Sequence, residues 1–202
     1  MQIVIATKNE GKIREIERIL ELENVEFLTF GDFKDWPQVE ESGSAFKENA
    51  ILKAQAVSSF TGLPVLADDS GLEVDVLGGE PGVMSARYAG PHCLTADNNA
   101  KLLEKLEGIH SPKRTARFRC VAAFAGYNGI LLLAEGNCSG HIALEPRGSG
   151  GFGYDPLFIP NGYAKTIAEL SAEEKNKISH RGKAFRALKK QLEKWLQKQT
   201  HN

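Results

Sequence analysis

The hydrophobic residues of this chain follow two different periods. Residues 2–6 (QIVIA) form a short β-branched run, and residues 12–21 carry apolar side chains at helical spacing. A second helical stripe begins after Ser44, a candidate N-cap, and stops at Gly62; the strand-like run 64–67 (PVLA) follows directly. The order strand, helix, strand predicts parallel strands in an α/β sheet, with the site built at the strand ends.

The middle of the chain changes to a strand pattern. The pair Asn128-Gly129 stands between two apolar runs and indicates a hairpin, because both positions tolerate positive φ. Residues 140–144 and 156–160 have the character of further short strands. We therefore expect a mixed sheet.

Two helices are predicted near the C-terminus. The first begins at Ser171, with Glu174 in the capping-box position. The second carries an apolar stripe, typical of a core-facing helix, at Phe185, Leu188, Leu192 and Trp195. Residues 31–44 are expected to form a long exposed connection.

Composition narrows the class of protein. The 202 residues are 42% hydrophobic and 25% charged, which suits one globular domain or a two-lobed unit. The net charge of -1 offers no general field for duplex DNA, so we expect no nucleic-acid partner. The three cysteines lack metal-ligand spacing, and no apolar run approaches membrane length. We expect a cytoplasmic protein without a membrane partner.

Asp68 and Asp69 come directly after the apolar run 64–67. If the strand is buried and ends there, Asp68 or Asp69 emerges at the C-terminal edge of the sheet, where a cation, a donor or water must meet the carboxylate. An Asx turn would explain one aspartate better than two. Ser70 and Gly71 are interpreted as the turn that follows.

A second acidic pair, Glu40 and Glu41, lies in the expected exposed connection. Such a pair is usually solvated surface. Brought beside Asp69, however, one of the two would complete a set of oxygen ligands of the kind that Mg²⁺ prefers.

Three further segments carry candidate chemistry. Residues 7–12 (TKNEGK) connect a strand to a helix, so their N–H groups and Lys12 could face an anion, although a plain polar connection is the alternative. Residues 148–153 (GSGGFG) match a dinucleotide pattern, but Pro156 and a strand-like run follow where that pattern needs a helix. They form either a turn between strands, which we favour on this motif alone, or a close approach to a flat ligand.

In the second case, Phe152 would supply a stacking face and Asp155 a polar contact. The third segment, residues 173–182 (EEKNKISHRG), places Lys175, His180 and Arg181 near a helix junction. Lys175 could simply interact favourably with the dipole at the C-terminus of a helix. His180 and Arg181 are donors suited to a carbonyl or phosphate oxygen.

Five ordered fragments together resemble the inosine/xanthosine triphosphate pyrophosphatase family over nearly the whole chain: TKNEGK, EESGSAFKENAILKA, LADDSGLEVDVLGGEPGVMSARYAG, GSGGFGYDPLF and AELSAEEKNKISHRGKA. The resemblance implies a Mg²⁺-dependent enzyme that hydrolyses ITP, dITP and XTP to the monophosphate and pyrophosphate. It implies a homodimer and, for residues 1–202 as a single domain, a two-lobed α/β fold. That fold has a long mixed central sheet flanked by helices and an active site in the cleft between the lobes.

The resemblance also implies site residues. The family's metal ligands match Glu40 and Asp69; Glu41 is a substitute, since a slip of one residue would exchange them. The general base matches Asp69, and we assign Asp68 a supporting role. The substrate contacts match Thr7, Lys8, Asn9, Glu10, Gly11, Lys12, Lys53, Ser70, Phe152, Gly153, Tyr154, Asp155, Lys175, His180 and Arg181. Lys8 stands where the family often has glycine.

The mechanism expected from these residues is attack of a metal-activated water on the α-phosphate, with Lys12 and Lys53 offsetting charge. Donors from His180, Arg181 or nearby backbone would distinguish the C6 carbonyl of hypoxanthine from the amino group of adenine. Two other functions stay open: a pyrophosphatase for other modified nucleotides, and a non-catalytic nucleotide- or RNA-binding module. The net charge and the paired acids disfavour the second.

Overall fold

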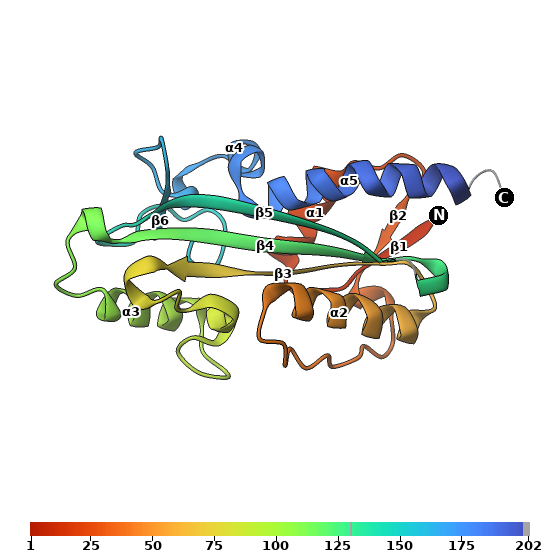
Figure 1. Ribbon diagram of the computed structural model, residues 1–202, viewed down its shortest axis with the longest axis horizontal. Coiled ribbons are helices and arrows are strands. Elements are labelled where there is room, and N and C mark those ends of the chain that lie inside the picture. The colour runs from red at the N-terminus through yellow and green to blue at the C-terminus, as the bar shows by residue number, and fades with distance from the viewer. Residues whose placement is uncertain (130, 200–202) are drawn as a thin grey trace. The chain divides into compact units, whose positions relative to one another are not determined.

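The computed structural model describes residues 1–129 and 131–199. They form an α/β fold with a six-stranded sheet in the order β2-β1-β3-β4-β5-β6 (Figure 1). The sheet is mixed as predicted, because β1 pairs in parallel with β2 and β3, and β5 pairs antiparallel with β6.

The chain divides into two compact units. Unit 1 comprises Met1–Asp69, Cys120–Gly136 and Arg181–Asn202, and unit 2 comprises Ser70–Arg119 and Asn137–His180. The expectation of one two-lobed domain concerns how these units combine, and it stays a prediction.

Three strands pass from one unit into the other along the chain. They are β3 (Val65–Val74), β4 (Thr115–Ala125) and β5 (Leu131–Ile142). The predicted turn, Asn128-Gly129, lies between β4 and β5, which are neighbours in the sheet, and Gly129 has a φ of 74°. This positive φ is the reason that the turn carries a glycine.

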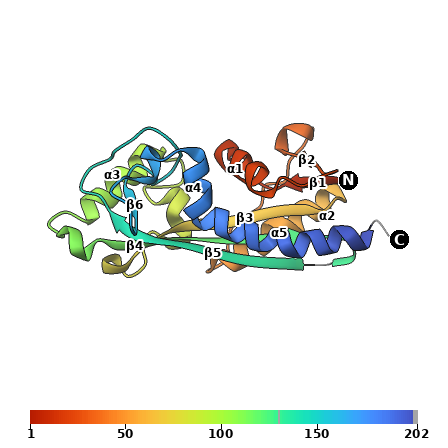
Figure 2. The ribbon, with the colours of Figure 1, turned by 90° about the horizontal axis from the view of Figure 1, so that it is seen from above.

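Unit 1 has helices on both faces of its strands. Its strands include β1 (Gln2–Ile5) and β2 (Glu26–Leu28), with Ile3 opposite Phe27. In Figure 1, α1 (Glu10–Leu20) and α5 (His180–Gln199) lie on one face, and α2 (Phe46–Thr61) lies on the other. The α1 stripe, the α5 stripe and alternate residues of β1 and β4 form one buried core. Figure 2 gives the view down onto α5.

Unit 2 has its own core. Its helices are α3 (Thr95–Lys105) and α4 (Ala172–Ile178), and its short strand β6 is Phe158–Pro160. Leu102 of α3 packs with Leu72 of β3, Phe118 of β4 and Phe158 of β6 in this cluster. Because each unit buries its own apolar set, each positions a separate group of polar side chains.

Several local predictions are confirmed. Ser171 caps α4, where its Oγ accepts from the Glu174 N–H at 3.2 Å and its own N–H donates to the Glu174 carboxylate at 3.0 Å. Gly62 ends α2 in the left-handed conformation. The apolar stripe of α5 is buried.

Two local predictions are wrong. Ser44 does not cap α2: the N-cap is Ala45, and the Ser44 N–H donates to the Glu48 carboxylate at 2.7 Å. The strand after α2 does not end at the aspartates, because β3 continues through Asp68, Asp69, Ser70 and Gly71 to Val74. There is therefore neither an Asx turn nor a Ser-Gly turn at this point.

Candidate active site

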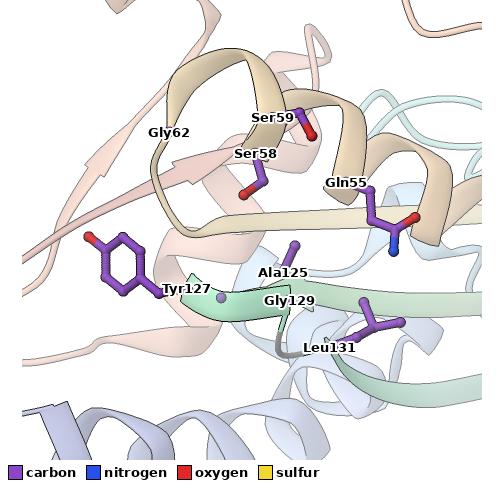
Figure 3. Close-up of a pocket in the computed structure, with 9 residues that line it drawn as sticks. Gln55, Ser58, Ser59, Gly62, Ala125, Tyr127, Gly129 and Leu131 are labelled. Carbon is purple, nitrogen blue, oxygen red and sulfur yellow. The ribbon is translucent and has the colours of Figure 1, made fainter.

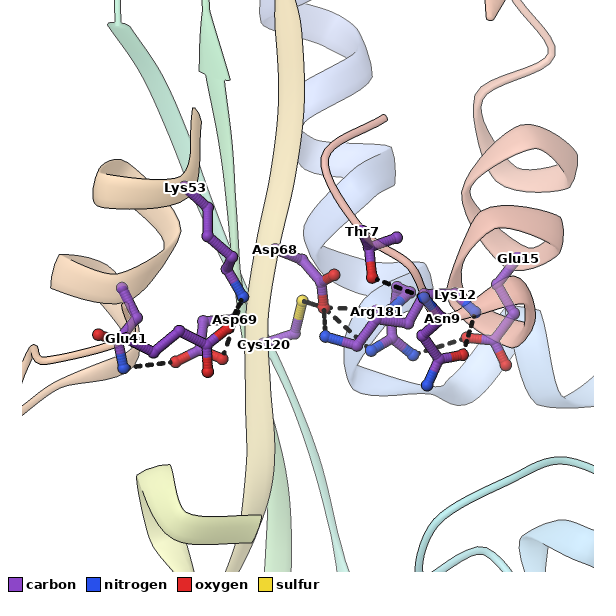
Figure 4. Close-up of polar contacts among 11 residues, drawn as sticks. Thr7, Asn9, Lys12, Glu15, Glu41, Lys53, Asp68, Asp69, Cys120 and Arg181 are labelled. Carbon is purple, nitrogen blue, oxygen red and sulfur yellow. Dashed lines mark hydrogen bonds and ion pairs between the residues drawn. The ribbon is translucent and has the colours of Figure 1, made fainter. Parts of the chain in front are cut away.

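Strand β3 sends Asp68 and Asp69 to opposite faces of the sheet. Successive side chains of a strand alternate between the two faces. Asp68 accordingly meets cations from α1 and α5, whereas Asp69 meets Asn49 and Lys53 of α2. Figure 4 shows the two carboxylates on either side of the β3 ribbon. The two acids thus have separate surroundings.

Asp68 is held by two cations from distant parts of the chain. Its Oδ2 accepts from Arg181 Nη2 at 2.9 Å and Nε at 3.3 Å, and Lys12 Nζ lies 3.1 Å away. Arg181 Nη1 also donates to Glu15 at 2.7 Å. Burial alone would raise the pKa of Asp68, but Arg181, Lys12 and Lys53 outweigh it and hold this pKa far below its ordinary value. The paired cations therefore favour the ionised form of Asp68.

Asp69 has a different electrostatic environment. Its Oδ2 accepts from Asn49 Nδ2 at 3.0 Å, and Lys53 Nζ lies 3.5 Å from its Oδ1. Lys53 Nζ also donates to Glu41 Oε1 at 2.6 Å. Burial raises the pKa of Asp69; Glu41 adds to this effect and Lys53 opposes it. A carboxylate with a raised pKa beside fixed cations is suited to accept a proton.

The two lysines also respond to burial. Burial lowers the pKa of Lys12, and the attraction of Asp68 offsets this only in part. Burial would lower the pKa of Lys53 too, but Asp69, Asp68 and Glu41 together raise it. We call the set formed by Lys12, Glu41, Lys53, Asp68, Asp69 and Arg181 the aspartate cluster; all six residues belong to unit 1.

Only the first three residues of the predicted loop 7–12 lie outside a helix. Helix α1 begins at Glu10, and Asn9 caps it by accepting from the Lys12 N–H at 3.0 Å. Thr7 Oγ1 accepts from the Asn9 N–H at 3.1 Å. Lys8 is exposed, exposed Glu10 pairs with Arg14, and Gly11 is the second residue of the helix. Of the six, Lys12 alone joins the aspartate cluster.

A second group of predicted residues gathers in unit 2, around residues 148–155, which we call the glycine-rich loop. Lys175 Nζ donates to Asp155 Oδ2 at 2.6 Å and lies 4.4 Å from the centre of the Phe152 ring. The Phe152 N–H donates to the same carboxylate oxygen at 2.8 Å. Phe152, Asp155 and Lys175 therefore form one contiguous cluster, with Gly153 and buried Tyr154 in the turn between the first two.

His180 and Ser70 belong to unit 2 as well. The His180 ring is buried and stacks on Phe118, with centroids 4.7 Å apart and planes 11° apart. Ser70 is a half-buried residue of β3. The predicted substrate residues thus divide between the two units.

The two glutamates of the acidic pair are in different positions. Glu41 is half-buried and pairs with Lys53, which links it to Asp69, whereas Glu40 is exposed. Among the described residues, no three side chains of His, Cys, Asp or Glu gather as a metal-binding set. Two carboxylates that share one ammonium group nevertheless have the charge and the hard oxygen donors that a divalent cation requires.

A separate pocket of about 510 Å³ lies elsewhere in unit 1, at the end of α2 and the turn after β4. Ser59, Gly62, Tyr127 and Leu131 contribute to its walls (Figure 3). No residue of the aspartate cluster lines this pocket. It is therefore distinct from the candidate site.

Sequence reasoning missed three contacts of the aspartates. They are made by Asn49 with Asp69, by Glu15 through Arg181, and by Cys120, whose Sγ lies 3.8 Å from Asp68 Oδ2. Asn49 belongs to the family fragment EESGSAFKENAILKA, but no spacing rule connects it to Asp69, 20 positions later. The other two come from elements that only the folded sheet brings to Asp68.

Comparison with known proteins identifies the family of this chain. The model of the Ham1 family matches residues 3–191. This chain belongs to the Ham1 family. It is 53% identical over 193 residues to a dITP/XTP pyrophosphatase of Desulforamulus reducens, covering 96% of this chain and 94% of the relative. It is 52% identical to a protein of the same name from Elusimicrobium minutum, covering 95% and 100%.

Solved structures of the family share the fold. A Ham1 protein from Coxiella burnetii superposes with a TM-score of 0.86 at 43% identity, covering 96% of this chain and 99% of that one. The Staphylococcus aureus Ham1 protein gives a TM-score of 0.84 at 42% identity, covering 96% and 98%. The α/β fold class and the resemblance stated from sequence are thereby confirmed. No helix in residues 1–129 and 131–199 is long and apolar enough to cross a bilayer.

Proposed function

We propose that this protein is a nucleoside triphosphate pyrophosphohydrolase that converts ITP, dITP and XTP to the monophosphate and pyrophosphate. Such an activity keeps noncanonical purine nucleotides out of DNA and RNA. The observation that carries the proposal is Asp69, a buried carboxylate of raised pKa beside Lys53, with Lys12 and Arg181 on the other face of the same strand. Relatives named dITP/XTP pyrophosphatase, about half identical over nearly the full length, support it.

Mg²⁺ is the proposed cofactor, and Glu41 and Asp69 are the residues that would hold it. Their carboxylates already share the cationic Lys53, at 2.6 Å and 3.5 Å. Glu41 has better support than Glu40, because Glu40 is exposed. When bound, Mg²⁺ neutralises phosphate charge and lowers the pKa of water.

The chemical step follows from the environment of Asp69. Asp69 orients a water molecule and takes its proton, while the water oxygen bonds to the α-phosphorus. The bond between that phosphorus and the bridging oxygen breaks, and pyrophosphate leaves with the electron pair. Asn49 keeps Asp69 in place through its hydrogen bond of 3.0 Å.

Asp68 supports this step without transferring a proton. Its pKa lies far below the ordinary range, so it stays ionised and fixes Arg181 and Lys12. Lys12 and Lys53 offset the charge of the triphosphate. The N-terminus of α1, capped by Asn9, adds N–H groups that favour an anion.

Unit 2 supplies the proposed base recognition. Phe152 offers a stacking face, and Asp155 and Lys175 fix its position through the contacts of 2.8 Å and 4.4 Å. Donors of the glycine-rich loop and of His180 would pair with the C6 carbonyl of hypoxanthine or xanthine. The amino group of adenine would leave such donors unpaired, so ATP would be rejected.

A homodimer and a cytoplasmic location complete the proposal, with neither nucleic acid nor membrane as a partner. The near-zero net charge is consistent with the absence of a polyanionic partner. Sedimentation equilibrium of the purified protein tests the dimer; a monomer at micromolar concentration would contradict it.

The main experiment is pyrophosphate release from ITP, dITP, XTP, GTP, ATP, dUTP and dTTP, with Mg²⁺ and with a chelator. We expect kcat/KM for the first three to exceed that for ATP by about 10⁴-fold, and activity to vanish with the chelator. Preferred turnover of a pyrimidine nucleotide would instead support a pyrophosphatase for other modified nucleotides. Binding of nucleotide without pyrophosphate release would refute an enzymatic role.

A further inference from the structure

Helix α3 reaches the glycine-rich loop through one side chain. Asn99 Nδ2 donates to the Gly153 carbonyl oxygen at 3.2 Å, across 54 residues of sequence. Asn99 is 9% exposed. A buried amide bonded to a backbone oxygen holds one particular peptide unit, here the one that joins Gly153 to Tyr154.

The direction of that peptide determines the direction of a donor. In a planar trans peptide, the C=O of one residue and the N–H of the next point in opposite directions. The bond from Asn99 fixes the Gly153 C=O towards α3, so the Tyr154 N–H points away from α3. Gly153 has a φ of 63°, so its backbone occupies a conformation that other residues rarely adopt.

Within the described part of the chain, the Tyr154 N–H has no hydrogen-bond partner, although Tyr154 is 4% exposed. Buried N–H groups are almost always paired, with a ligand or water if not with protein. The Tyr154 side chain does not compete for this role, because its hydroxyl donates to the Ser85 carbonyl at 2.9 Å. The N–H is therefore available to a bound acceptor.

The chemistry of Asn99 suits this task. The Gly153 oxygen is an acceptor only, so the atom of Asn99 that faces it must be the NH₂ group. The other amide atom, Oδ1, is buried without a partner in the described residues. An aspartate of the same shape would place a carboxylate against the Gly153 oxygen and lose the bond.

We infer that Asn99 is a positioning residue for base selection: it aims the Tyr154 N–H at the C6 carbonyl oxygen of the bound purine. This inference rests on the proposed function and adds a residue to it. ITP and XTP present a carbonyl acceptor to this N–H. ATP presents an amino group, whose hydrogens cannot accept the bond.

Adjacent Asn98 provides a matched control. It lies on the same helix and is 6% exposed, but its Nδ2 donates to the Ala86 carbonyl and its Oδ1 accepts from the Ala89 N–H, away from the glycine-rich loop. The experiment measures kcat and KM for ITP and ATP in wild type, Asn99→Ala, Asn99→Asp and Asn98→Ala, with thermal unfolding of each. Asn99→Asp keeps the shape of the side chain and decides the question if Asn99→Ala does not fold.

For both Asn99 variants we expect the ratio of kcat/KM for ITP over ATP to fall by about three- to tenfold, the value of one hydrogen bond. The change should appear mainly in KM for ITP. Asn98→Ala should lose thermal stability while keeping the wild-type ratio within about twofold.

An unchanged ratio in Asn99→Asp, or an equal fall in Asn98→Ala, would overturn the inference while wild type still prefers ITP. A wild-type protein that does not hydrolyse ITP at all would overturn the proposed function itself. The two failures are thus distinguished by the wild-type measurement.

Discussion

The aspartate cluster and the glycine-rich loop are held in place by different forces. In the aspartate cluster, ion pairs between side chains set the geometry: Asp68 with Arg181 and Lys12, and Lys53 with Glu41 and Asp69. In the glycine-rich loop, the backbone takes part in most contacts, since the Phe152 N–H and the Gly153 carbonyl are themselves bonded. A change of charge should therefore damage the first region, and a change of backbone direction the second.

The largest expected effect is on the rate of the chemical step, kcat, without a change in substrate preference. Asp69→Asn keeps an oxygen for the Asn49 N–H but cannot take a proton, so kcat for ITP should fall by about 10²- to 10⁴-fold. The ITP over ATP ratio should stay near the wild-type value. Steady-state pyrophosphate release with saturating Mg²⁺ measures both quantities. A variant with wild-type kcat would remove Asp69 from the mechanism.

The next effect is on stability. Arg181→Met removes the guanidinium that lies 2.9 Å from the buried Asp68 carboxylate, so the free energy of unfolding should fall by about 3 kcal/mol. Asp68→Asn added to Arg181→Met should restore part of the loss. Urea unfolding curves measure these values. The matched change in unit 2, Lys175→Met, should lower the free energy of unfolding by less, because Asp155 still accepts the hydrogen bond from the Phe152 N–H. Equal losses of stability in the two variants would contradict the proposed difference between the regions.

A smaller effect concerns the metal. Glu41→Gln removes one of the two charges that Lys53 bridges, so the Mg²⁺ concentration for half-maximal activity should rise by about 10- to 100-fold. Glu40→Gln should raise it much less, since Glu40 is exposed. A Mg²⁺ titration of activity in both variants decides between them. A larger rise in Glu40→Gln would assign the metal to Glu40.

The smallest effect concerns the base. Phe152→Ala removes a stacking face, so kcat/KM should fall by about tenfold for ITP and ATP alike. His180→Ala should narrow the ITP over ATP ratio more than Phe152→Ala does. Steady-state measurement of kcat/KM for ITP and ATP in both variants makes this comparison. If each variant lowered kcat/KM for ITP and for ATP by the same factor, base discrimination by His180 would be refuted.

Local patterns predicted much of the fold. The capping box at Ser171, the stop at Gly62 and the stripe of α5 each depend on residues within a few positions of one another, and each is confirmed. Strand β2 and helix α3 were not predicted. The first is three residues long, and the second carries buried Asn98 and Asn99 among its apolar positions.

The course of β3 could not be predicted from its own residues. Asp-Asp-Ser-Gly is a typical turn sequence, because these residues favour turns and are poor in strands. It is a strand here because cations reach both acids from elsewhere; Arg181 is 113 residues from Asp68. The same long-range pairing explains why candidate site residues could be proposed from family motifs while the residues that contact them in the fold, Asn49 and Glu15, could not.

The central claim is that water attacks the α-phosphate and pyrophosphate leaves. The most direct test is mass spectrometry of both products after hydrolysis of ITP in H₂¹⁸O. The account predicts equal amounts of IMP and pyrophosphate, with one ¹⁸O atom in the IMP and none in the pyrophosphate. Label in the pyrophosphate, or release of IDP and orthophosphate, would contradict it.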